Sequence, residues 1–333
     1  MIDLAFVWAL LIAFAVFAYV VLDGFDLGIG ILFPWIDSGR ERDTAMNSVA
    51  PVWDGNETWL VLGGGGLLAV FPLAYAIIMT ALYAPVIAML LGLILRGVAF
   101  EFRFKSENNK AVWDAAFFSG SLVAALSQGI MLGALVQGIA VENRAYAGGW
   151  FDWLTPFSAM TAIALVIGYA LLGACWMIMK TEGELREDAF VFARKLAVGL
   201  LIAIAVVSLW TPFLEAQYFV RWLSWPSILY VAPVPILTLI AAWRLIASLA
   251  AGREREPFLA TLALFLLCYI GLGINLYPNI VPPNVTIWDA AAPESSLAFL
   301  LVGALILVPM ILAYTAYAYW VFRGKVDPDG GYH

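Results

Sequence analysis

The sequence predicts an all-α, polytopic membrane protein with nine transmembrane helices, its N-terminus outside and its C-terminus in the cytoplasm. Hydrophobic residues make up 64% of the 333 positions and charged residues only 12%, with a mean hydropathy of +0.93. Too few charged side chains are available to cover a soluble core of this size. The apolar residues also gather into stretches of about 20 residues, the length that crosses a bilayer as a helix.

Charged or Pro/Gly-rich segments separate the apolar stretches, and the division near Pro72 and Pro85 is the least defined, because the run from Leu60 to Leu95 carries no charge. The first stretch has no basic segment before it and no A-x-A cleavage site, so we expect it to be retained as a span. Residues 1–333 are therefore expected to form a single membrane domain. The expected spans are 5–35, 56–78, 80–100, 115–140, 157–180, 195–214, 227–248, 258–277 and 297–322.

The distribution of basic residues supports nine spans. If the chain crosses nine times from an outside N-terminus, all of its 17 Lys and Arg residues except Arg144 and Arg221 lie on the cytoplasmic side. Lys and Arg are enriched in cytoplasmic loops, so this orientation is favoured. The net charge of −7 is confined to short loops, and no basic patch suited to nucleic acid is present.

The sequence offers few groups that hold a redox centre. Its one histidine is His333, so no imidazole is available inside the membrane to bind haem, copper or iron. Cys175 and Cys268 lie in separate apolar stretches without metal-ligand spacing, which favours a packing role for both. We therefore expect no metal site in this chain and no redox centre of its own.

Two carboxylates interrupt the first apolar stretch in the segment LDGFDLGIG, residues 22–30. Asp23 and Asp26 share one helix face, and the glycines at 24, 28 and 30 allow another backbone to approach, which suits a protein partner. A carboxylate at the membrane centre costs about 2.5–3.5 kcal/mol, so such groups face the bundle interior or a hydrated path.

Two further clusters lie toward the cytoplasmic side. In NSVAPVWDGNETWL, Asp54 and Glu57 share a face, and two interpretations stay open: Asp54 or Asn56 caps the helix, or Asp54 joins Asp23 in a proton- or ion-binding group. In LRGVAFEFRFKSE, two interpretations also stay open: the charges form a solvated end of the helix, or Arg96 neutralises Asp23 or Asp54. On the outer side, the Pro-rich segment 275–296 is expected to form an ordered loop.

Five segments, spread from residue 23 to 322, together resemble subunit II of cytochrome bd-type quinol oxidases, including the cyanide-insensitive branch. In the Pro-rich segment 275–296, Trp288 and Asp289 are expected to begin the last helix. The five matching segments are DGFDLGIG, NSVAPVWDGNETWL, LRGVAFEFR, NLYPNIVPPNVTIWDAA and LVPMILAYTAYAYWVF.

The resemblance implies a haem-free partner in a respiratory complex of the bacterial cytoplasmic (inner) membrane. Subunit I would carry the b- and d-type haems and oxidise the quinol, while O2 is reduced to water. Asp54 and Asp23 match carboxylates that deliver protons, and Trp59 matches a residue on an oxygen path. The residue pattern, apart from the resemblance, adds Asp26, Glu57 and Arg96 to these candidate site residues. A structural quinone, a small single-helix subunit and bound lipid are compatible with the resemblance.

Two other functions remain open. One is a self-sufficient secondary transporter or channel whose intramembrane acids bind a coupling ion. No internal repeat is visible, and the acids gather toward one side, which disfavours it. The other is a structural subunit that completes a complex without moving protons or oxygen.

Overall fold

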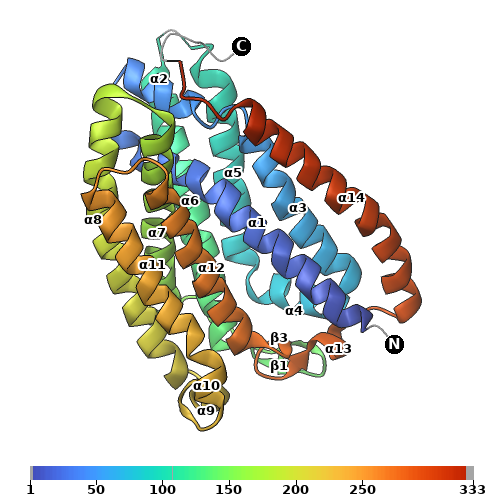
Figure 1. Ribbon diagram of the computed structural model, residues 1–333. Coiled ribbons are helices and arrows are strands. Elements are labelled where there is room, and N and C mark those ends of the chain that lie inside the picture. The colour runs from blue at the N-terminus through green and yellow to red at the C-terminus, as the bar shows by residue number, and fades with distance from the viewer. Residues whose placement is uncertain (1–2, 107, 328–333) are drawn as a thin grey trace.

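The computed structural model of the protein describes residues 3–106 and 108–327. Long helices lie side by side and make up most of these residues (Figure 1). The all-α fold predicted from composition is confirmed. The long helices are α1 (Leu4–Leu32), α3 (Trp53–Val70), α5 (Tyr83–Arg103), α6 (Lys110–Gln137), α7 (Pro156–Lys180), α8 (Gly183–Trp210), α11 (Pro233–Ala250), α12 (Glu256–Leu276) and α14 (Glu294–Val321).

Short elements connect the long helices at both ends of the bundle. Two antiparallel hairpins, β1 with β2 and β3 with β4, are the β-structure of the described residues. The short elements are η1 (Phe33–Trp35), α2 (Arg40–Asn47), α4 (Pro72–Ala81), β1 (Val141–Glu142), β2 (Ala145–Tyr146), η2 (Thr211–Phe213), α9 (Ala216–Leu223), α10 (Ser227–Val231), β3 (Asn279–Val281), β4 (Val285–Thr286) and α13 (Ile287–Ala290).

The second expected span is broken. Within the described ranges, eight helical segments are long and apolar enough to cross a membrane, and the pair α3 and α4 makes nine if it counts as one span. The chain bends by 119° between the two helices. Pro72 begins α4, and Phe71 before it takes a non-helical conformation (φ −124°, ψ 62°), because a proline disfavours helical geometry in the preceding residue.

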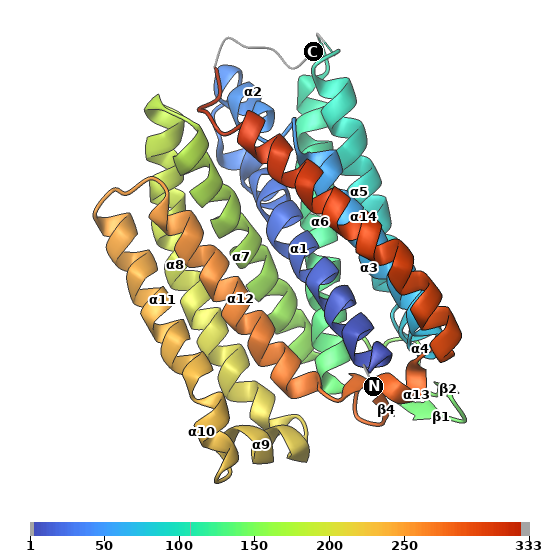
Figure 2. The same cartoon turned by 45° about the vertical axis from the view of Figure 1, so that its right-hand side comes forward.

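The chain enters and leaves the bundle at opposite ends (Figure 2). Helix α1 begins beside α13 and the β-hairpins, whereas α14 ends near α2. An odd number of crossings produces this arrangement. Which end faces the cytoplasm stays a prediction from the basic residues.

Two expected boundaries were wrong. Helix α8 begins at Gly183 rather than near residue 195, because its polar first turns continue the helix beyond the apolar stretch and still bury Leu185 and Ala189. Trp288 and Asp289 do not begin the last helix. They lie in α13, whose capping box closes between Thr286 and Asp289, and the chain is extended before α14 starts.

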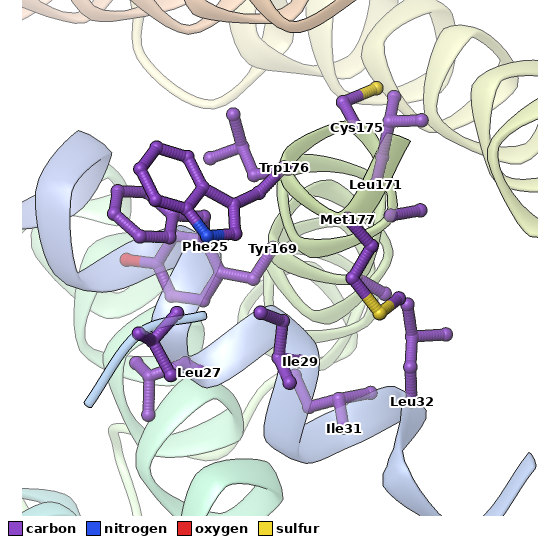
Figure 3. Packing of buried hydrophobic residues seen from close by; sticks show 14 of the residues in the cluster. Phe25, Leu27, Ile29, Ile31, Leu32, Tyr169, Leu171, Cys175, Trp176 and Met177 are labelled. Carbon is purple, nitrogen blue, oxygen red and sulfur yellow. The ribbon is translucent and has the colours of Figure 1, made fainter. Parts of the chain in front are cut away.

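Helix α1 lies at the centre of the fold, where it packs on α7, α3 and α6. Figure 3 shows the contact between α1 and α7: Phe25 stacks on Trp176 with ring centroids 4.1 Å apart. Tyr169, one of the buried residues in the same view, lies against Gly24.

The glycines of α1 allow this helix to touch its neighbours through the backbone. A Cβ atom on Gly28 would lie 1.8 Å from the carbonyl oxygen of Tyr169, and one on Gly173 would lie 2.5 Å from the carbonyl carbon of Gly28. A Cβ atom on Gly30 would lie 2.0 Å from Oγ of Ser121 in α6. The predicted close approach is confirmed, but the neighbours are helices of this chain, so the face is not a surface for a protein partner.

An ion cluster joins three segments at the end of the bundle that carries α2. The buried guanidinium of Arg103 pairs with Asp43 of α2 and with Asp114 of α6. Arg42 also binds Asp114, at 2.8 Å, and donates to the carbonyl oxygen of Ile36 at 2.9 Å. These contacts fix the segment after α1 against α5 and α6.

Helix α14 is held mainly at its end. Its main contacts with the bundle are made with α1 and α3, Tyr319 also packs on Trp176 of α7, and most of its surface is exposed. The ammonium group of Lys180 donates to the carbonyl oxygens of Phe322 and Gly324, the latter at 2.7 Å, and the amide of Val326 donates to the carbonyl oxygen of Lys180 at 2.8 Å. Lys180 therefore ties the end of α14 to the end of α7.

We expect Gly28→Ala to lower the free energy of unfolding by about 3 kcal/mol, because the new methyl group overlaps the backbone of α7 and forces the two helices apart. Denaturation of the purified protein by SDS, followed by circular dichroism, measures the change. Gly273→Ala in α12 is the control, since nothing lies within 4 Å of its added Cβ atom. Equal stability of the two variants would contradict the proposed contact.

Candidate functional site

The three clusters singled out in the sequence meet where α1, α3 and α5 converge. Nη1 of Arg96 lies 2.6 Å from Oδ1 of Asp23, and both side chains are fully buried. Nη2 of the same arginine contacts Oε1 of Glu57, whose side chain is 27% exposed. Arg96 thus neutralises Asp23, as predicted, and its second partner is Glu57 rather than Asp54.

Asp26 belongs to a second set of hydrogen bonds, next to the Arg96–Asp23 pair. Its Oδ2 accepts a hydrogen bond of 2.7 Å from Nδ2 of Asn56, which also donates to the carbonyl oxygen of Leu22 at 3.1 Å. The hydroxyl of Tyr319, on α14, donates to Oδ1 of Asn56 at 2.9 Å. Four helices therefore contribute to one polar region in the interior of the bundle.

The charges of this region do not balance if every group is ionised. One guanidinium, from Arg96, faces three carboxyl groups, those of Asp23, Asp26 and Glu57. Oδ2 of Asp23, Oδ1 of Asp26 and Nε of Arg96 are buried, and none has a hydrogen-bond partner among the described residues. Buried polar atoms are costly unless they are paired, so these atoms are favourable positions for water or an exchangeable proton.

Asp54 lies outside this buried network. It is exposed in the first turn of α3 and makes no hydrogen bond or ion pair with the described residues. The capping interpretation was wrong, because α3 has Val52 at its N-cap and no side chain caps it. Asn56 instead points at α1. Asp54 and Glu57 are three residues apart on α3, so the exposed acid lies beside the half-buried one.

Trp59 is buried among Ala15, Ala18 and Tyr19 of α1, and its ring meets Phe14 edge to face at 5.6 Å. Beside this cluster, an apolar groove of about 490 Å³ runs between α1, α3 and α14. Its lining includes Ala15 and Leu62, which also belong to the cluster around Trp59. Glycines 65 and 66 of α3 also line the groove and place no side chain into it.

Several members of the site were missed in the sequence. Asn56 was considered only as a cap, and Tyr319 was only part of a segment of resemblance. Tyr19 and Gln128, which lie next to the network, carried no signal beyond being polar groups in apolar stretches. That property is itself a signal, because a polar side chain inside a membrane helix needs a partner.

The cysteines divide between the interior and the surface. Cys175 is buried beside Thr261, as expected of a packing residue. Cys268 is exposed, so its predicted place in the core was wrong: it lies on a face of α12 that the described bundle leaves uncovered. Among the described residues, no group of three or more His, Cys, Asp or Glu is placed to hold a metal ion, and His333 lies outside them.

Comparisons with known proteins agree with one another. The profile of the family "Cytochrome bd terminal oxidase subunit II" matches residues 4–322. Cytochrome bd-I ubiquinol oxidase subunit 2 of Escherichia coli (strain K12) is 30% identical over 377 aligned positions, covering 98% of this chain and 96% of that protein. Cytochrome bd ubiquinol oxidase subunit 2 of Bacillus subtilis (strain 168) is 26% identical, with 96% of each chain covered.

The fold also resembles a solved structure. A chain of the bd oxidase from Geobacillus thermodenitrificans superposes with a TM-score of 0.75 over 96% of this chain and 99% of that chain. The two sequences are 19% identical, so this likeness concerns the fold.

We expect Arg96→Gln to lower the free energy of unfolding by about 3 kcal/mol, because it leaves buried carboxylates without a counter-charge. Adding Asp23→Asn should recover part of the loss, since the double variant removes one of those charges. A double-mutant cycle of SDS denaturation midpoints measures the coupling. Strictly additive losses would show that the two groups do not interact.

Proposed function

Because this chain belongs to the cytochrome bd terminal oxidase subunit II family, and is therefore a subunit of a membrane-bound quinol oxidase, we propose that its acids deliver protons to the subunit that reduces O2. The chain is a multi-pass protein of the bacterial inner membrane, and its family implies a subunit I partner. In this family the haems lie in that partner. The b- and d-type haems would supply the electron transfer there.

The reaction explains why acids are needed. Reduction of O2 to water consumes one proton for each electron, so protons must reach a reaction centre that lies within the membrane. Carboxyl groups linked by hydrogen bonds or water can pass them inward. The observation that carries the proposal is the buried group of Asp23, Asp26, Glu57 and Arg96, which has more acids than bases and retains unpaired oxygens.

The depth of the acids suggests an order. Asp54 is exposed, Glu57 is 27% exposed beside it, and Asp23 and Asp26 are fully buried. Protons would enter at Asp54, from the end of the bundle that carries most of the basic residues and that we infer to be cytoplasmic. Arg96 connects Glu57 to Asp23 and limits the number of protons that the group holds.

We also propose that the groove beside Trp59 gives O2 access to the partner. O2 is apolar and dissolves in the membrane interior, and the groove of about 490 Å³ has an almost wholly apolar lining. Trp59 packs where the groove meets the buried cluster of α1.

The alternatives differ in what they require. A self-sufficient transporter agrees poorly with the family, whose named relatives are oxidase subunits. A purely structural role in the complex differs from our proposal only in the behaviour of the acids. Quinol, a structural quinone, a small single-helix subunit and lipid remain proposed ligands or partners of the complex.

Asp54→Asn keeps the shape of the side chain and removes its exchangeable proton. We expect quinol-driven oxygen uptake by the assembled complex to fall about tenfold, with the haem absorbance unchanged. Glu101→Gln is the control, since Glu101 is an exposed acid at the same end of the bundle, and Lys105 is its ion-pair partner among the described residues. Turnover equal to that of the control would favour the purely structural role.

Trp59→Ala should change the apparent KM for O2 several-fold while the rate at saturating O2 changes little, because the cavity it leaves lets the side chains that border the groove shift. Trp59→Phe retains most of the apolar bulk and should keep the original oxygen dependence. Oxygen consumption traces near anaerobiosis measure both quantities. A normal KM in Trp59→Ala would remove this residue from the oxygen path.

A further inference from the structure

A second series of hydrogen bonds reaches the acids from the opposite side of α1. The hydroxyl of Tyr169, on α7, donates to Oε1 of Gln128 at 2.7 Å, and Nε2 of Gln128, on α6, donates to the hydroxyl oxygen of Tyr19 at 2.8 Å. Both tyrosines are buried. This series plays no part in the proton path described above.

The series stops one group short of Asp23. Tyr19 accepts from Gln128, which leaves its own hydroxyl hydrogen available to donate. Oδ2 of Asp23 is buried and has no donor among the described residues. Tyr19 precedes Asp23 by four residues on α1, so the two side chains share a face, and the Tyr19 hydroxyl lies within reach of the Asp23 carboxyl. An unused donor and an unused acceptor therefore lie side by side.

We propose that Tyr19, oriented by Gln128 and Tyr169, is a positioning residue that donates its hydroxyl hydrogen to Oδ2 of Asp23 and holds Asp23 as a fixed anion opposite Arg96. The inference rests on the proposed proton-delivery function and assigns different roles to its acids. Asp23 stays negatively charged, and the exchangeable proton resides on Asp26 or Glu57.

The direction of the donors supports this role. Each group in the series donates toward Asp23, so the hydrogen bonds polarise one another and stabilise a negative charge at their end. The amide of Gln128 is neutral and holds its hydrogens firmly, so the series orients Tyr19 and does not conduct protons. Asp26 lacks such support, because its donor is the neutral amide of Asn56.

The surroundings of Asp23 contain other charged and titratable groups, and each influences the charge that it carries. They are Tyr19 and Asp26 on α1, Glu57 on α3, Arg96 on α5, Tyr169 on α7 and Tyr319 on α14.

The test is infrared spectroscopy of the assembled oxidase with Tyr19→Phe, which removes the donor and keeps the ring. A carboxylic-acid C=O band should appear as Asp23 takes up a proton, and it should vanish when Asp23→Asn is added. Tyr269→Phe is the matched control, since its hydroxyl also binds α1, at the carbonyl oxygen of Ala13 (2.7 Å), and does not touch the acids. Tyr169→Phe should give a weaker band, because it only loosens Gln128.

The pH dependence of oxygen uptake gives the second measurement. Loss of the donor should move the acid-side decline of Tyr19→Phe to higher pH by about one unit, the value of a hydrogen bond to a charged group. If the band appears and the pH profile does not move, the inference holds and the proposed proton delivery by the neighbouring acids fails. Identical infrared spectra for Tyr19→Phe, Tyr169→Phe and Tyr269→Phe would overturn the inference. If Tyr19→Phe does not assemble, Tyr169→Phe against Tyr269→Phe decides the question.

Discussion

A guanidinium and a carboxylate, Arg96 and Asp23, form an ion pair that is wholly removed from solvent inside an apolar bundle. Each charge alone would be very costly at this depth, so each residue requires the other. This requirement fixes the register of α1 against α5. The packing of α3 and α1 then places Glu57 and Asp26 close to the Arg96–Asp23 pair. The same helix arrangement that pairs the two charges therefore gathers the remaining acids around them.

The packing of α1 supports this arrangement by a different means. Backbone contact at Gly28 and Gly173 leaves no room for rotation of α1 against α7, and the stacked rings of Phe25 and Trp176 fill the space beside it. Helices in a membrane gain little from burying apolar surface, so close packing of small residues has to provide the rigidity. The acids are consequently held by a stiff scaffold, as groups that exchange protons over short distances need to be.

The sequence predicted the elements whose signals are local. Apolar stretches located the spans, and the cost of isolated charges predicted that Arg96 pairs with Asp23 or Asp54, of which it binds Asp23. Contacts between distant segments escaped prediction: Tyr319 reaches Asn56 across 263 residues, and nothing near either residue indicates the other. Asp54 was placed next to Asp23, yet it is exposed, because the depth of a residue depends on where α3 begins. The bend before Pro72 was also uncertain, because an uncharged apolar run does not show where a helix turns.

The link between Lys180 and the end of α14 has a consequence for biosynthesis. Helices enter the membrane in the order in which they are made, so the acids of α1 are inserted long before the residues of α14 exist. Asn56 can bind Asp26 early, but Tyr319 arrives only with the last described helix, which touches the bundle lightly until Lys180 secures its end. The polar region is therefore completed only after α14 has been made, and a newly made chain remains without its finished acid network until α14 is secured.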